Sequence, residues 1–327
     1  MSTATSCEIS ITAGGKKGTL KKLLAPEAPF RSSVSFDTFQ FELVDYKHRD
    51  DPDWSEWRSN LKGVIGGSDI AALLGHNTSV SPRACLKQIH GITAKKEPNH
   101  FAKTCMNHGK KYESTVLEVL GMYQKMCPGI TVVYEISRIS DPTGPKIRVC
   151  VSPDHYVANG GCLYEVKCPY VGSTGEFGDS YAFYANNRAR YPIGKEAYFL
   201  QALFYRVMLN LTLNTLRFGD NFGVAIGLVN NDEEITVRLL DYRHHTGALV
   251  IITRLLEKLL RHTSPGEIER WRVTKDERGG VTDCMRTSFS VCYVLSGRPL
   301  GMDGSLLLLE EHSESDSRDN SPSPPRE

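Results

Sequence analysis

The stretch Ser152–Pro169 reads SPDHYVANGGCLYEVKCP, and it decides how the rest of the chain is interpreted. Asp154 stands at the end of one expected strand, and a Glu-Val-Lys triplet in a second expected strand starts eleven residues later. Because side chains alternate between the faces of a strand, Glu165 and Lys167 point to the same face, away from Val166. A carboxylate and an ammonium on one face of an apolar strand are unusual in a protein core.

These residue types suit the hydrolysis of a phosphodiester. Asp154 and Glu165 offer the oxygen ligands that hold a divalent metal, and Lys167 can orient or deprotonate a water beside it. The alternative is a solvated Glu–Lys pair on an edge strand, which contributes little to stability. The residues alone leave both interpretations open.

The order of expected elements predicts an α/β domain with a mixed central β-sheet flanked by helices. We expect helices at 53–60, 69–75, 82–90, 107–125, 196–210 and 246–262, and strands at 130–137, 146–152, 162–168, 223–229 and 234–240. A chain of 327 residues fits one such domain with tails. We therefore assign residues 1–45 to a poorly ordered lead-in, 46–265 to the domain, 266–311 to a C-terminal extension and 312–327 to a disordered Ser/Pro/acidic tail.

Composition gives a local rather than a global indication of a partner. The formal net charge is only +1, but residues 81–112 carry seven Lys or Arg against one acid, Glu97. Such a stretch is typical of a surface that binds a phosphate backbone, and equally of a solvated helical face.

Nine scattered cysteines without a CxxC pair predict reduced thiols in an intracellular protein. Cys105 and His108 have no second pair at zinc-finger spacing, so no structural zinc is expected. No apolar run reaches the about 18–20 residues of a membrane span, which predicts a soluble protein without a membrane partner. A nuclear location is expected if the chain comes from a eukaryotic virus or host.

Four separated motifs resemble one known family. They are GVIGGSD at 63–69, GKKYE at 109–113, SPD at 152–154 with EVKCP at 165–169, and AYFLQ at 197–201. In this order they are similar to the phage lambda exonuclease, or YqaJ-type viral recombinase, family of the PD-(D/E)xK nuclease superfamily. The resemblance extends from about Trp54 to about His262 and implies a core like that of the restriction endonucleases.

The resemblance implies a role for each motif residue at the catalytic centre. Asp154, Glu165 and the backbone carbonyl of Val166 would bind Mg²⁺ or Mn²⁺, two ions in all. Lys167 would act as base or water-orienting group, with a pKa that a nearby cation depresses.

For two further motif residues, the resemblance implies a role at the site, and an ordinary structural role is the alternative. Glu113 would reach the second ion or its water; otherwise it forms an ordinary helical pair with Lys110. Gln201 would orient the site or a phosphate; otherwise it is a buried structural glutamine. His155 stands where relatives have Gly, and a turn or surface role is expected for it.

A second group of residues is implied to bind a 5′-terminal phosphate of the substrate. The Gly-Gly-Ser turn presents backbone N–H groups and the Ser68 hydroxyl to an anion, although Ser68 can also simply cap the following helix. Arg58 resembles the family arginine that pairs with this serine. Two extra residues separate Arg58 from the turn, so Lys62 is a candidate substitute.

The resulting hypothesis is a Mg²⁺-dependent 5′→3′ exonuclease of viral type. It would degrade linear double-stranded DNA with 5′-phosphorylated ends and leave 3′ single-stranded tails for recombination. The family implies a single-strand annealing protein as partner and a homo-oligomeric ring. Residues 171–195, with Arg188 and Arg190, either grip DNA or pack as a loop. The alternatives are a structure-selective endonuclease of the same superfamily and a non-catalytic DNA-binding module.

Overall fold

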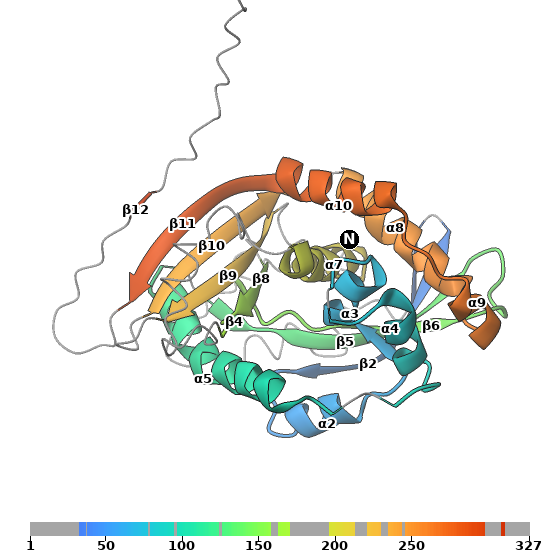
Figure 1. Cartoon of the computed structure of the whole chain (residues 1–327), viewed down its shortest axis with the longest axis horizontal. Helices are drawn as coiled ribbons and strands as arrows, with labels where there is room; N and C mark the ends of the chain where they lie inside the picture. The colour runs from blue at the N-terminus through green and yellow to red at the C-terminus, as the bar shows by residue number, and fades with distance from the viewer. Residues whose placement is uncertain are drawn as a thin grey trace, which may run out of the picture.

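A computed structural model shows an α/β architecture with two mixed sheets and helices on their faces (Figure 1). The structure describes residues 33–36, 38–77, 79–94, 97–123, 126–157, 163–170, 196–212, 221–229, 235–243, 246–297 and 309–310. The predicted fold class is confirmed, but the hydrogen bonds divide the strands into two sheets rather than one. The connection 171–195 and the tail from 312 lie outside the described residues.

The first sheet has the strand order β1-β2-β5-β6-β3. Its strands are β1 (Ser33–Phe36), β2 (Phe39–His48), β3 (Val64–Gly66), β5 (Ile130–Arg138) and β6 (Ile147–Val151). Among these described strands β3 and β6 pair in parallel, and the other pairs are antiparallel. Strands β1 and β2 lie inside the region expected to be a poorly ordered lead-in, so that expectation is wrong from residue 33 onward. Phe39 and Phe41 alternate with partly exposed Gln40 and are fully buried, which is the pattern of a half-buried strand.

The second sheet has the order β12-β11-β10-β9-β8-β7-β4. Its strands are β4 (Met126–Pro128), β7 (His155–Val157), β8 (Leu163–Lys167), β9 (Asn221–Val229), β10 (Ile235–Arg243), β11 (Phe289–Gly297) and β12 (Leu309–Glu310). Strands β8 and β9 are parallel, and the other pairs are antiparallel. Two short crossings join the sheets, at Gly129 between β4 and β5 and at 152–154 between β6 and β7, in addition to the long helical connection from β3 to β4.

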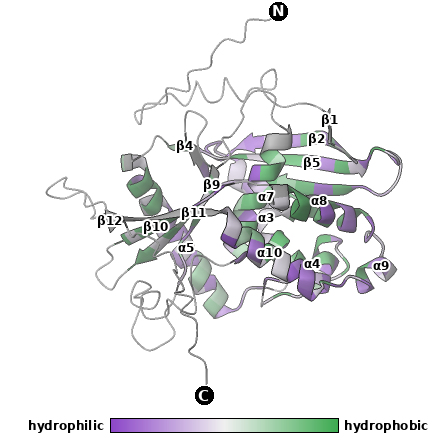
Figure 2. Cartoon of the chain, turned by 90° about the horizontal axis from the view of Figure 1, so that it is seen from above, coloured by the Kyte–Doolittle hydropathy of each residue, from purple (hydrophilic) through white to green (hydrophobic). Residues whose placement is uncertain are grey.

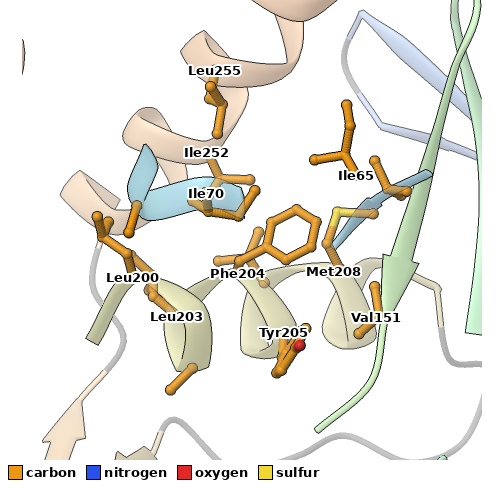
Figure 3. Packing of buried hydrophobic residues seen from close by; sticks show 14 of the residues in the cluster. Ile65, Ile70, Val151, Leu200, Leu203, Phe204, Tyr205, Met208, Ile252 and Leu255 are labelled. Carbon is orange, nitrogen blue, oxygen red and sulfur yellow. The ribbon is translucent and has the colours of Figure 1, made fainter. Parts of the chain in front are cut away.

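Helix α7 (Glu196–Thr212) is the centre of the main core (Figure 3). Its Leu200, Leu203, Phe204 and Met208 are fully buried. They pack with residues of α3 (Gly67–Leu73), α8 (Thr246–Leu260) and the first sheet, including Ile70, Ile252 and Val151. Figure 2 shows α3, α7 and α8 beside β2 and β5, with α10 (Lys275–Ser288) on the far side of them.

Helix α5 (His100–Tyr123) covers the other face of the second sheet. Val116 and Leu120 of α5 pack on Tyr164 and Val166 of β8, while Leu163 belongs to the core around α7. The expected alternation along β8 is therefore confirmed: one of its faces meets α5 and the other meets α7.

The remaining helices are α2 (Trp54–Asn60), α4 (Pro82–Ile89) and α9 (Pro265–Glu269). Gly75 and Gly91 adopt positive φ after α3 and α4, as expected for residues that end helices. Helix α5 starts at His100 rather than at 107, because the Asn99 side chain accepts a hydrogen bond from the Ala102 N–H and caps it. None of the helices in the described ranges has the length and apolar composition that a bilayer crossing requires.

The packing of α7 predicts a large loss of stability for Phe204→Ala. Removing this fully buried ring leaves a cavity between α7, α3 and α8, so the free energy of unfolding should fall by about 3–5 kcal/mol. The control is Val250→Ala on the exposed side of α8, which should change it by less than about 0.5 kcal/mol. Urea unfolding followed by circular dichroism measures both. A loss below about 1 kcal/mol for Phe204→Ala would contradict the described core.

Candidate active site

Two carboxylates lie side by side where the sheets meet. Asp154 is in the crossing between β6 and β7 and is 9% exposed, and Glu165 on β8 is 1% exposed. The backbone N–H of Val166 donates to Asp154 Oδ2 at 2.8 Å, which fixes the crossing against β8. Because Glu165 is buried, the alternative of a solvated Glu–Lys pair is wrong.

Lys167 and Gln201 both contact the same oxygen of Glu165. Lys167 Nζ pairs with Glu165 Oε1 from the same face of β8, as the alternation predicted. Gln201 on α7 donates from Nε2 to that oxygen at 2.5 Å and also contacts the Tyr205 hydroxyl at 3.3 Å. The structure thus places the motif glutamine at the carboxylate pair and not in a separate part of the core.

Glu113 reaches the same centre from α5, through a residue that no motif contained. Arg49, just after β2, donates from Nη2 to Glu113 Oε1 at 3.1 Å and pairs through Nη1 with Asp154 Oδ1. In the described structure the partner of Glu113 is therefore Arg49 and not Lys110. Sequence reasoning missed Arg49 because it follows a strand that was assigned to the lead-in.

The surroundings push the pKa values of the two buried carboxyl groups apart. Burial and the charge of Asp154 raise the pKa of Glu165 to about 8, against the opposing effect of Lys167. Burial acts in the same direction on Asp154, but Lys167, Arg49 and the Val166 N–H outweigh it and lower its pKa. Environments that separate two carboxyl groups in this way are typical of catalytic sites.

The pKa of Lys167 is shifted opposite to the expectation for a metal-loaded site. Burial lowers it, but the charges of Glu165 and Asp154 outweigh burial and raise it above its ordinary value. The physical reason is that the carboxylates are the nearest charges in the structure. Lys167 is therefore a protonated ammonium here, suited to donating hydrogen bonds.

The residue types around the carboxylate pair fit a hard divalent cation. Asp154, Glu165 and Glu113 offer carboxylate oxygens, which Mg²⁺ and Mn²⁺ prefer. Glu165 Oε2 is buried without a hydrogen-bond partner. Buried acceptors normally have a donor or a cation beside them, so this oxygen is available to a metal ion. As arranged, the described ranges hold no ready group of three His, Cys, Asp or Glu ligands, and Arg49 bridges Asp154 and Glu113.

The expected phosphate-binding residues meet at the start of α3. A Cβ built on Gly66 would lie 3.5 Å from Arg58 Nη2 and 4.0 Å from Ser68 Oγ, so the two extra residues do not keep Arg58 from the turn. Asp69 Oδ2 accepts the Gly66 N–H at 2.8 Å and caps the helix. The capping alternative for Ser68 is therefore wrong, and Ser68 and Lys62 are both exposed.

Tyr205 connects this turn to the carboxylate pair. A Cβ on Gly67 would lie 2.5 Å from the Tyr205 ring, so only glycine lets α3 approach α7 this closely. The hydroxyl of the same ring is the one that Gln201 contacts. The Gly-Gly-Ser turn and the catalytic candidates are thus two sides of one packed unit.

A cavity of about 420 Å³ opens beside the carboxylate pair. Glu113, Lys110 and Lys167 line it together with Tyr170 and Tyr198. Its size and its mixed charged and aromatic walls suit part of a nucleotide. The basic stretch is divided, because Lys87 on α4 pairs with Glu269 of α9, away from this cavity.

His155 is the first residue of β7 and is partly buried, so the turn or surface role expected for it is wrong. Burial and the charge of Arg49 lower the pKa of His155 to about 4, which keeps its ring neutral. The ring of His108 packs against Tyr112 and Tyr170, with centroids 4.8 and 5.3 Å away. The expectation that Cys105 and His108 form no structural zinc site stays a prediction.

One comparison with known proteins gives a match to a family model. Residues 53–206 match the YqaJ-like viral recombinase domain, and every motif residue discussed above lies inside that range. No curated protein and no solved structure gives a significant match. The residues that the resemblance selected are those that the fold brings together around Glu165 and Gly66. Residues 53–206 of this chain thus match the model of the YqaJ-like viral recombinase domain, a family whose members are generally nucleases.

Proposed function

We propose that the chain is a metal-dependent deoxyribonuclease that degrades linear double-stranded DNA from its 5′ ends. The product is DNA with 3′ single-stranded tails, as recombination requires. One observation carries the proposal: the buried carboxylates Asp154 and Glu165 share a packed unit with Lys167, Gln201 and Glu113.

The site residues divide the chemistry among them. Mg²⁺ or Mn²⁺, held by Asp154, Glu165, the Val166 carbonyl and Glu113, would supply positive charge at the scissile phosphate and its attacking water. Lys167, kept protonated by its carboxylate neighbours, orients the water through its N–H groups. Gln201 holds Glu165 in place through a 2.5 Å hydrogen bond.

The exonuclease assignment depends on the Arg58–Ser68 pair. A guanidinium and an exposed hydroxyl near Gly66 match the oxygens of a terminal phosphate. Because Tyr205 packs the turn against Gln201, a 5′ phosphate bound there has a fixed position relative to Glu165. A single-strand annealing protein and a homo-oligomeric ring are the partners that the match to this family favours.

The first prediction concerns metal dependence and the substrate end. Wild-type protein with Mg²⁺ should consume a linear 5′-phosphorylated duplex from its labelled 5′ end and spare a circular duplex, and EDTA should stop the reaction. Glu165→Gln and Lys167→Ala should each lower the rate by at least about 100-fold. Gel assays of labelled DNA measure this.

The matched control is Glu118→Gln, which changes the same residue type on the exposed side of α5 and should keep wild-type activity. Cutting of the circular duplex would favour the structure-selective endonuclease instead. If the wild-type protein with Mg²⁺ degrades neither the linear nor the circular duplex, a non-catalytic DNA-binding role is the better account.

The second prediction separates recognition of the 5′ phosphate from catalysis. Ser68→Ala and Arg58→Met should lower the rate on 5′-phosphorylated ends by roughly tenfold and change little on 5′-hydroxyl ends, because only the former offer the anion. Arg261→Met, which removes an exposed cation just after α8, is the control and should behave like wild type. Equal losses on both kinds of end would show that the turn does not read the phosphate.

A further inference from the structure

Arg49 occupies the position between two proposed metal ligands. Its guanidinium pairs with Asp154 through one nitrogen and with Glu113 through the other, the second at 3.1 Å. Its side chain is 19% exposed, against 12% for Asp154 and 31% for Glu113. Arg49 therefore links the crossing between the sheets to α5 at the mouth of the site.

The fold builds a support specifically for this guanidinium. Arg49 Cζ lies 4.9 Å from the centre of the Trp54 ring, and the Trp54 indole donates to Thr131 Oγ1 at 2.8 Å. Thr131 Oγ1 in turn contacts Ser152 Oγ at 2.7 Å, next to the Asp154 crossing. A guanidinium stacked on a held aromatic ring keeps its place while its N–H groups exchange partners.

The charges of the cluster explain why Arg49 stabilises the carboxylates and why it competes with a divalent ion for them. Among the described residues, two cations, Arg49 and Lys167, form ion pairs with Asp154, Glu165 and Glu113, so the fully ionised cluster keeps one formal negative charge. Without Arg49, three carboxylates would face a single ammonium, which is costly for partly buried groups. A divalent ion that takes oxygens of both Asp154 and Glu113 competes with the guanidinium that already bonds them.

We propose that Arg49 is a counter-cation that the metal displaces, and that the displaced guanidinium, still stacked on Trp54, binds a phosphate of the DNA. The inference rests on the proposed function, because it needs the divalent ion. It makes Arg49 a positioning residue that stabilises the carboxylates before the ion arrives. The same residue then contributes to substrate binding afterwards, since a guanidinium pairs with phosphate as it does with carboxylate.

Metal and DNA affinities of Arg49→Met give the test, because this variant keeps the aliphatic length and removes the charge. Calorimetric titration of the full chain with Mg²⁺ is done at a pH above the pKa of Glu165, which is about 8. Arg49→Met should then bind Mg²⁺ roughly tenfold more tightly than the wild type does. Binding of a 5′-phosphorylated duplex, with Ca²⁺ in place of Mg²⁺, should weaken by roughly tenfold. Arg49→Lys, which cannot bridge two carboxylates, should shift the Mg²⁺ affinity in the same direction and by less.

Lys47→Met is the matched control. Lys47 lies on β2, two residues before Arg49, and is likewise near a tryptophan, 5.8 Å from the Trp57 ring centre; it pairs with the exposed Asp53. This variant should leave the Mg²⁺ affinity unchanged.

Opposite shifts of the two affinities are the signature of the proposed exchange. Weaker or unchanged Mg²⁺ binding in both Arg49 variants would overturn it and make Arg49 a fixed structural bridge. Unchanged DNA binding would overturn the transfer to phosphate. If the wild type binds no Mg²⁺, the proposed function itself fails. If the wild type binds Mg²⁺ but neither Arg49 variant binds it more tightly, the proposed role of Arg49 is rejected and the proposed function is not.

Discussion

The burial of Asp154 beside Glu165 is the constraint on which the rest of the site depends. Two carboxylates at 9% and 1% exposure repel each other in surroundings that solvate neither well. Lys167, Gln201, Arg49 and the Val166 N–H all donate to this pair. Even so, the pKa of Glu165 stays raised to about 8 and its Oε2 lacks a donor. Burying two carboxylates together costs free energy, and the donors around them do not fully balance their charge. Such a site is suited to a divalent cation.

The two-sheet architecture is what brings the pair together. Asp154 lies in one short crossing between the sheets, and Gly129 of the other short crossing donates its N–H to the Asp154 carbonyl at 2.9 Å. A Cβ on Gly129 would lie 1.9 Å from the Pro153 carbonyl oxygen, so the crossings approach closely only because this residue is glycine. Helix α7 then supplies Gln201 from one face of β8, and α5 supplies Glu113 from the other side.

Local patterns predicted much of the fold and the candidate site. The alternation along β8, the glycines after α3 and α4, and the core helix α7 were all accessible, because period and turn chemistry are properties of neighbouring residues. The strands β1 and β2 were missed because the lead-in was judged by its Gly, Ser and Pro content, although Phe39 and Phe41 alternate with Gln40. The role of Arg49 could not be predicted from the sequence for a different reason. Its partners lie 64 and 105 residues away in sequence, and no local pattern encodes such pairings. The division into two sheets likewise depends on long-range pairing.

The central claim is that the Asp154–Glu165 pair binds a divalent metal. Anomalous diffraction from crystals of the full chain grown with Mn²⁺ tests it most directly, because manganese is located without reference to activity. The account predicts an anomalous peak with a carboxylate oxygen of both Asp154 and Glu165 at about 2.0–2.3 Å. It also predicts that this peak is absent from crystals of Glu165→Gln. A manganese peak elsewhere in the protein, or none in the wild type, would contradict the account.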